Sequence, residues 1–235
     1  MRYGSVRNMS STYQPNFVLR YMMKIERFEV NPFQENCYIV SDETGEGIII
    51  DCGAFYEEER RAVVEYVRDN GISLKHLIST HAHIDHNFGN NTIYEQFGLK
   101  PEVHAADEPL MGKLAEQALM FCNYRLGYEM PPVGRFLTEA DTISFGTHTL
   151  SIINTPGHTP GSVFFYCKEE KVAFSGDTLF RMSIGRTDFE LGSYKDIMES
   201  LKSLPKKMDG ETVILPGHGP KTTLKFEMDN NPYFK

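Results

Sequence analysis

The sequence predicts a single layered α/β domain, and two observations support this class. Short runs rich in β-branched and aliphatic residues alternate with amphipathic segments. Two halves, each β-rich at its start and helical later, also follow one another without a long linker. The length of 235 residues suits one large domain, and a hydrophobic share of 40% supplies a sizeable core.

In the first half, turn residues such as Asn31 and Pro32 separate short runs that have the composition of strands. We expect strands at residues 24–30, 37–41, 47–51 and 76–79. Apolar residues that recur every three or four positions predict helices at residues 57–70, 85–97 and 109–121.

The second half returns to a β pattern after a turn-rich connection at residues 127–134. We expect strands at residues 142–145, 149–154, 162–166, 172–175 and 212–215. A helix is expected at residues 194–204, between the last two of these strands.

The composition excludes several classes of partner. With 32 acidic residues against 24 Lys and Arg, the net charge is −8, which repels phosphate backbones, so we expect no nucleic-acid binding. Apolar runs stay far below the ~20 residues of a membrane span, so we expect no membrane partner. Four cysteines without paired spacing predict a reducing, cytoplasmic location: Cys37, Cys52, Cys122 and Cys167. The expected partner is a small-molecule substrate, and the oligomeric state is left open.

The first part of the chain has a different composition from the rest. Residues 1–22 contain basic but no acidic residues, and they have no apolar stretch of signal-peptide length. We interpret them as a dispensable N-terminal extension, so that the domain comprises residues 23–235. An organellar presequence is the alternative.

Residues 80–86 concentrate side chains that bind metal ions. They follow the expected strand 76–79 and place His81, His83, Asp85 and His86 within six positions. Because side chains at i and i+2 of an extended segment point the same way, His81 and His83 can hold one ion together. If the chain then turns into a helix, Asp85 and His86 face a second ion. Imidazole and carboxylate ligands suit zinc, iron or manganese.

Three further ligand-type residues follow expected strands. His158 lies between two Pro-Gly turns, His218 lies between Gly217 and Gly219, and Asp177 follows the strand 172–175. A carboxylate can bridge a pair of ions, which such sites hold ~3.5–4 Å apart. Either histidine alone would be an ordinary turn residue, but together with the first cluster they predict one metal site. The other histidines match no motif and are interpreted as surface or structural residues: His76, His104 and His148.

This order of residues, HxHxDH followed by His, Asp and His, resembles that of the metallo-β-lactamase-fold hydrolases. The resemblance covers nearly everything from Lys24 onward. It implies a four-layer αββα sandwich with two divalent metal ions at one edge of its sheets, expected to be zinc, with iron or manganese as alternatives. The implied ligands are His81, His83 and His158 for one ion, Asp85, His86 and His218 for the other, and Asp177 as the bridge.

Within this family the sequence is most similar to the short bacterial members of the glyoxalase II-like branch. The similar segments are residues 175–180, 184–189 and 216–220. True β-lactamases of this fold typically carry a cysteine at the position of Asp177, so β-lactam hydrolysis is disfavoured. Longer glyoxalase II enzymes add a helical C-terminal domain with basic residues for glutathione, whereas only residues 219–235 follow His218 here.

Three more residues are expected to support the site. The family resemblance suggests that Asp51, at a strand end, orients a metal-binding histidine and thereby fixes its tautomer and ring angle. Arg186 and Asp188 are interpreted as an ion pair that holds a loop in shape, with direct substrate binding as the alternative.

These residues predict hydrolysis of a thioester such as a hydroxyacylglutathione. Two divalent ions, partly offset by Asp85 and Asp177, retain a positive surplus that holds hydroxide near neutral pH and stabilises an oxyanion. Asp85 is expected to orient this nucleophile and to take its proton. A thiolate leaves easily, because thiol pKa values lie near ~8.5.

Other functions fit the same residues. Persulfide dioxygenases resemble this chain in length and in residues 185–188, and they use one iron on a triad that maps to His81, His158 and Asp177. The Gly219-Pro220 pair after His218 is more similar to the hydrolase branch. Lactone hydrolysis on the dinuclear site is a further alternative, and a non-enzymatic metal-binding module is a remote one.

Overall fold

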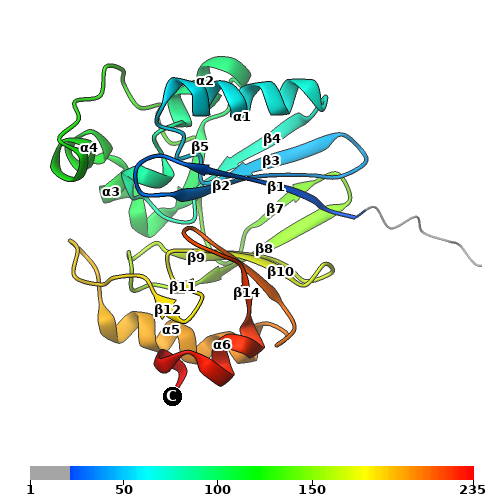
Figure 1. Cartoon of the computed structure of the whole chain (residues 1–235), viewed down its shortest axis with the longest axis vertical. Coiled ribbons are helices and arrows are strands. Elements are labelled where there is room, and N and C mark those ends of the chain that lie inside the picture. The colour runs from blue at the N-terminus through cyan, green and yellow to red at the C-terminus, as the bar shows by residue number, and fades with distance from the viewer. Residues whose placement is uncertain (1–21) are drawn as a thin grey trace, which may run out of the picture.

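Two mixed six-stranded sheets pack face to face, and helices cover the outer face of each sheet (Figure 1). The computed structural model describes residues 22–235. The predicted four-layer αββα sandwich is confirmed. The predicted extension falls, except for Met22, outside the described residues, so its dispensability stays a prediction. Every helix within residues 22–235 is too short or too polar to cross a bilayer.

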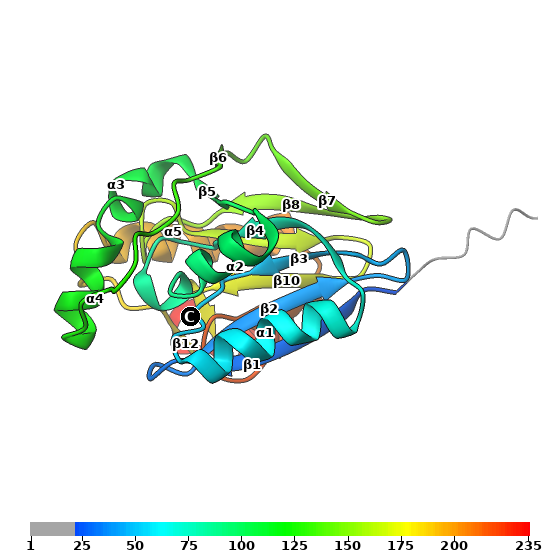
Figure 2. The same cartoon turned by 90° about the horizontal axis from the view of Figure 1, so that it is seen from above.

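The first sheet has the strand order β1-β2-β3-β4-β5-β6. Its strands are β1 (Lys24–Val30), β2 (Glu35–Ser41), β3 (Glu46–Ile50), β4 (Ser73–Ile78), β5 (Pro101–His104) and β6 (Arg135–Leu137). The first three are antiparallel, and from β3 to β6 neighbouring strands are parallel. Helices α1 (Glu57–Asp69) and α2 (Asn90–Phe97) lie over its outer face, while α3 (Glu108–Met111) and α4 (Leu114–Cys122) lie toward one end (Figure 2).

The second sheet has the strand order β14-β13-β10-β9-β8-β7. Its strands are β7 (Thr142–Phe145), β8 (His148–Asn154), β9 (Val163–Cys167), β10 (Val172–Gly176), β13 (Val213–Pro216) and β14 (Thr222–Thr223). A small hairpin of β11 (Leu179–Phe180) and β12 (Ser183–Ile184) follows β10. Helices α5 (Tyr194–Lys207) and α6 (Leu224–Asn230) cover the outer face of this sheet (Figure 1).

Alternating side chains along the central strands account for both packing layers. In β3, Ile48 and Ile50 belong to the core between the sheets, whereas Ile49 packs with Val63 and Val67 of α1 on the other face. Strand β9 alternates in the same way between the inner core and the layer under α5. Strands that are buried on both faces appear in the sequence as continuous apolar runs, and for this reason their positions could be predicted.

The predicted helix at residues 85–97 is wrong in its first turns. Ile84–His86 forms a single 3₁₀ turn, and the α-helix begins only at Asn90. The N–H of Gly89 donates to the carbonyl oxygen of Cys52 at 2.8 Å, and Nδ2 of Asn87 donates to the carbonyl oxygen of His83 at 2.6 Å. These bonds to other segments and side chains hold the loop in shape in place of a continuous helical ladder.

Smaller differences concern short elements. The predicted helix at residues 109–121 is split at Gly112 and Lys113 into α3 and α4, and α5 extends three residues beyond the predicted end at residue 204. The sequence did not indicate β5, β6, β11, β12, β14 or α6. These strands have only two to four residues, so they lack the length over which a period of two is recognisable.

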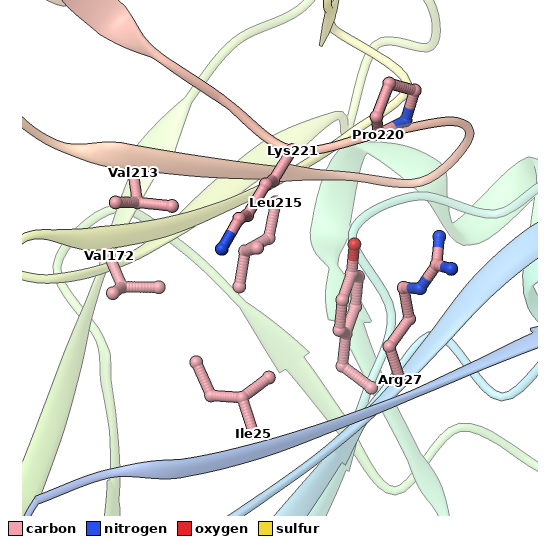
Figure 3. A pocket seen from close by; sticks show the side chains of 8 residues that line it. Ile25, Arg27, Val172, Val213, Leu215, Pro220 and Lys221 are labelled. Atoms are coloured by element: carbon pink, nitrogen blue, oxygen red, sulfur yellow. The ribbon is translucent and has the colours of Figure 1, made fainter.

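An open groove of about 580 Å³ lies between β1 and the β10–β13 pair (Figure 3). Ile25 of β1 lies across the groove from Val172 and Val213 of the second sheet. Its other lining residues are aliphatic, aromatic or basic, without any histidine, cysteine or carboxylate. This groove therefore lacks the residue types of the predicted chemistry.

Asp42 joins the two sheets at the end of β2. Its carboxylate accepts hydrogen bonds from the N–H groups of Thr44 (2.9 Å) and Thr147 (2.8 Å), and it lies 3.1 Å from Nδ1 of His148. Burial opposes the charge, but these donors together lower the pKa of Asp42 below its usual range. His148, which matches no sequence motif, is thus a structural residue that connects the β7–β8 turn to the first sheet.

We predict that Asp42→Asn lowers the free energy of unfolding by about 1–3 kcal/mol at pH 7, because a buried amide accepts the hydrogen bonds from Thr44, Thr147 and His148 less well than the carboxylate does. A folded-state pKa below the unfolded value means that this contribution is present above the unfolded pKa and is lost as the pH falls. The difference between wild type and variant should therefore shrink under acid conditions. Denaturant titrations at several pH values measure it, with the exposed Asp229→Asn as control; an equal loss at acid pH would contradict it.

Candidate metal centre

The chemistry-bearing residues predicted from the sequence lie in loops at one edge of the two sheets. The segment 80–86 follows β4 of the first sheet. His158, Asp177 and His218 follow β8, β10 and β13 of the second sheet. Because β10 and β13 are parallel, their carboxyl ends meet at this edge, where β4 of the facing sheet also ends.

The first group consists of His81, His83 and His158, whose ring nitrogens lie within 4.8 Å of one another. Nδ1 of His83 is 2.8 Å from Nε2 of His158, and both rings are buried. His81 and His83 are two residues apart in an extended segment, which is the arrangement that the sequence predicts.

The second group consists of Asp85, His86 and His218. Oδ2 of Asp85 is 3.3 Å from Nε2 of His218 and 3.7 Å from Nε2 of His86. A 3₁₀ turn at residues 84–86, and not the predicted helix, places Asp85 and His86. The ring centroid of His86 lies 4.2 Å from that of His81, so the two groups are adjacent.

Asp177 lies between the two groups. Its Oδ1 is 3.4 Å from Nε2 of His86, and its Oδ2 is 3.6 Å from Nε2 of His158 and 3.5 Å from Nε2 of His218. Burial opposes the charge of this carboxylate, but His86 and His218 hold its pKa well below the usual range. One carboxylate therefore reaches histidines of both groups, and all seven predicted ligand positions come together.

The outward-facing nitrogens of four imidazoles are occupied by the protein. The nearest partners of these Nδ1 atoms are Thr80 Oγ1 for His81 (3.0 Å), Asp51 Oδ2 for His86 (3.1 Å), the Arg186 carbonyl for His158 (2.7 Å) and the Phe33 carbonyl for His218 (3.0 Å). Such partners fix the tautomer and the ring orientation, so the Nε2 atoms are directed toward the centre.

Asp51 contacts one of the clustered histidines, His86, at the end of a strand. It follows β3 with a left-handed φ of 54°, a conformation that Asp and Asn adopt more readily than most residues. Its oxygens accept hydrogen bonds from the N–H (2.6 Å) and the hydroxyl (2.7 Å) of Thr80, in addition to the contact with His86. Asp51 thus positions both the start of the loop and one of its histidines.

Two buried carboxyl residues near the centre had no signal in the sequence. Asp107 accepts hydrogen bonds from the N–H groups of Ala82 (2.9 Å) and Gly161 (2.6 Å), and so joins the 80–86 loop to the loop that carries His158. Glu35 lies 3.8 Å from Nδ1 of His86, and burial raises its pKa well above the usual range. Both residues lie far along the chain from the motifs that they contact.

The pKa shifts of His81 and His83, in the first group of residues, are opposite in direction to that of His86 in the second group. Burial lowers the pKa of His83 to about 3 and that of His81 well below its usual value, so both rings are neutral at pH 7. Burial also disfavours a charged His86, but the surrounding carboxylates, with Asp177 first, raise its pKa well above the usual value. Neutral imidazoles and ionised carboxylates are the protonation states that bind metal ions.

The residues fit a pair of divalent ions. Nε2 of His81, Nε2 of His86 and Oδ1 of Asp177 are buried and have no hydrogen-bond partner within residues 22–235. Buried polar atoms without partners are costly, and several that converge on one point indicate a ligand that all of them share. Histidine and carboxylate donors suit zinc, iron or manganese.

A cavity of about 480 Å³ opens directly onto this centre. His83, Asp85, His158, Asp177 and His218 line it together with several aromatic side chains. The groove of Figure 3 has about 580 Å³ but none of these residue types, so the chemistry assigns the function to the smaller cavity.

Arg186 and Asp188 form the ion pair expected from the sequence at the rim of this cavity. Nε and Nη2 of Arg186 donate to the two carboxylate oxygens of Asp188 at 2.7 and 2.8 Å. The guanidinium carbon lies 3.9 Å from the ring centroid of Phe189. Arg186 is thus engaged by a carboxylate and an aromatic ring of its own loop.

Comparison with known proteins gives consistent results. A family model described as the metallo-beta-lactamase superfamily matches residues 30–218. Hydroxyacylglutathione hydrolase GloC of Haemophilus influenzae is 33% identical over 220 residues, which are 90% of this chain and 98% of that protein.

Two solved structures are similar along most of their length. The BLEG-1 B3 metallo-beta-lactamase has a TM-score of 0.82 at 29% identity, covering 90% of this chain and 100% of that one. TTHA1623 in a di-iron-bound form has a TM-score of 0.76 at 34% identity, covering 88% and 99%. The family match includes all seven clustered residues. The chain therefore belongs to the metallo-beta-lactamase superfamily, as a metal-dependent hydrolase with a histidine-rich site.

Proposed function

We propose that this protein is a dinuclear metallohydrolase that cleaves thioesters. The observation that carries the proposal is the convergence of seven histidine and aspartate side chains, in two groups joined by Asp177, at one cavity that five of them line. We assign His81, His83 and His158 to one ion and Asp85, His86 and His218 to the other. The proposed metal is zinc, or iron as in the di-iron-bound TTHA1623, with manganese as a further alternative.

The reaction needs a nucleophile, a means of stabilising negative charge, and an acceptor for a proton. When bound, the two ions supply hydroxide near neutral pH and stabilise the oxyanion of an attacked carbonyl. The oxygen of water adds to the acyl carbon, the C–S bond breaks, and the thiol leaves as thiolate. Since thiol pKa values lie near ~8.5, this leaving group needs little protonation.

Asp85 is the residue that we assign to proton transfer. Its carboxylate lines the cavity, its side chain is 18% exposed, and its Oδ2 lies 3.3 Å from Nε2 of His218. The burial of Asp177 (11% exposed) between the histidines suits a bridging role instead. A carboxylate at the open side of the site can orient water and accept its proton.

The similarity to GloC, whose name describes it as a hydroxyacylglutathione hydrolase, supports a thioester as the substrate. A second candidate is β-lactam hydrolysis, because the fold matches that of the BLEG-1 B3 metallo-beta-lactamase with a TM-score of 0.82. Both reactions attack a carbonyl with water, so the same centre serves either. Asp177, at a position where β-lactamases of this fold typically carry a cysteine, favours the thioester, and substrate assays compare the two activities.

We predict that the metal-loaded protein cleaves S-lactoylglutathione or a related thioester while dissolved oxygen stays constant. Hydrolysis involves no redox step, whereas a dioxygenase would consume oxygen. Thiol release is measured with a disulfide reagent, oxygen with an electrode, and β-lactam opening with nitrocefin, all on one preparation. Oxygen uptake with glutathione persulfide and negligible thioester cleavage would favour the mononuclear iron dioxygenase; faster nitrocefin opening would favour the second candidate.

We predict that Asp177→Ala and His218→Ala each lower the metal content by about one ion per chain or more, because each removes a ligand from a site of few ligands. Elemental analysis of the purified variants measures this content. Cys167→Ala is the matched control, since Cys167 is buried in β9 but lies outside the metal-binding groups. Full loading of both ligand variants would contradict the assignment.

We predict that Asp51→Asn weakens binding of the ion held by His86 about 10–100-fold, because an amide cannot hold the Nδ1 proton of His86 as a carboxylate does. Asn tolerates the left-handed backbone at this position, so the fold should remain. Competition with a chelator measures the affinity. Asp42→Asn is the control, because it should lower stability without weakening metal binding. Equal metal affinity in wild type and Asp51→Asn would show that Asp51 does not act through His86.

A further inference from the structure

The walls of the active-site cavity are apolar and come from four separate segments. Phe33 precedes β2, Phe121 lies near the end of α4, Phe180 lies in β11, and Phe189 lies in the loop before α5. Phe33 and Phe121 are 41% and 37% exposed, so large aromatic surfaces face the opening. Ile84, from the metal-binding loop itself, completes the apolar part of the lining.

These rings begin directly at the metal-binding imidazoles. The centroid of Phe189 lies 5.4 Å from that of His83, and the centroid of Phe180 lies 6.1 Å from that of His218. Phe121 extends the wall outward, with its centroid 5.0 Å from that of Phe189. A substrate whose carbonyl is held at the centre therefore extends between aromatic walls.

The basic side chains around the cavity are already paired. Arg186 is the one cation among the described residues that line the cavity, and it makes two hydrogen bonds to Asp188. In the adjoining hollow, Nζ of Lys113 lies 2.7 Å from Oε1 of Glu190. A carboxylate on the acyl group would thus meet the negative faces of phenyl rings and cations whose charge is already offset.

We propose that this site selects thioesters with a neutral, apolar acyl group and discriminates against acyl groups that carry a carboxylate. This inference rests on the proposed thioester hydrolysis and specifies its substrate class. Burial of apolar acyl surface against the rings favours the first kind of substrate. Loss of carboxylate hydration in an acyl site without an unpaired basic side chain disfavours the second. Phe121 and Phe189 are the specificity-determining residues, and Arg186 positions Phe189.

The test compares two acyl groups of similar size on one thiol, the 4-methylbenzoyl and 4-carboxybenzoyl thioesters of N-acetylcysteamine. We expect kcat/KM of the metal-loaded protein to be at least about tenfold higher for the methyl compound, in line with discrimination in apolar pockets. The acetyl thioester serves as reference. Cleavage of the acetyl compound with equal rates for the other two, or with a preference for the carboxylate, would overturn the inference but leave the proposed function intact. Cleavage of none of the three would refute the proposed function itself.

Removal of one wall should reduce the selectivity without removing the metals. We expect Phe121→Ala to lower the ratio of kcat/KM for the 4-methylbenzoyl thioester to kcat/KM for the acetyl thioester about tenfold. Phe136→Ala is the matched control, since Phe136 is 41% exposed but lies outside this cavity. An equal loss on both thioesters, with full metal content, would contradict the role of Phe121.

A binding measurement separates recognition from reactivity. The thioether analogue S-(4-methylbenzyl)-N-acetylcysteamine cannot be hydrolysed, and calorimetry on the metal-loaded protein should show it to bind about tenfold more tightly than its 4-carboxybenzyl counterpart. Phe121→Ala should weaken the first compound only. Equal affinities of the two compounds would contradict an apolar acyl site.

The ion pair at the rim offers a gain-of-function test. Asp188→Asn removes the charge that offsets Arg186 but keeps the size of the side chain. We expect this variant to raise kcat/KM for the 4-carboxybenzoyl thioester and to reduce the preference for the methyl compound severalfold. An unchanged preference would show that the pairing of Arg186 does not determine the discrimination.

Discussion

The imidazoles of the candidate metal centre are held in their orientations by groups outside the centre, and this requirement governs the placement of the surrounding loops. Four histidines have their Nδ1 atoms held by a hydroxyl, a carboxylate or a carbonyl, so that the opposite nitrogens point to one place. Each holding group comes from another loop or from a residue near the end of a strand. The loops must therefore converge, and the parallel pairs β3–β4 and β10–β13 deliver them to the same edge.

Further buried polar residues, outside the seven-residue cluster, hold the loops in fixed positions relative to one another. Asp107 joins the 80–86 loop to the loop of His158, and Asn36 donates to the carbonyl oxygens of Pro216 and Gly219 on either side of His218. These bonds connect residues that are up to 183 positions apart in sequence. The centre is consequently a property of the complete sandwich and not of any single motif.

The sequence alone was sufficient to predict those parts of the protein whose residues form a local pattern along the chain. The clustering of the seven histidine and aspartate residues was predictable because each follows a strand-like run in a recognisable order. Strands β2 and β3 were predictable because their residues are buried on both faces. Asp107 was not predictable, because its donors, such as the N–H of Ala82, come from distant loops. The prediction of a helix beginning at Asp85 was wrong for the same reason, because the N–H of Gly89 donates to the carbonyl oxygen of Cys52 in a distant segment. The aromatic lining of the cavity could not be predicted, because its four phenylalanines come from four separate segments of the chain.

The spread of the ligands along the chain has a consequence for how the protein matures. The group of His81, His83 and His158 is complete in sequence before the group that needs His218. A ribosome that adds about 5–20 residues per second reaches His218 roughly 3–12 seconds after His158. For that interval the nascent polypeptide carries one complete group and lacks only His218 of the other. Assembly of the complete centre is thus a late event of biosynthesis, because the loop of His218 must first be made and then contact Phe33 and Asn36 near the start of the domain.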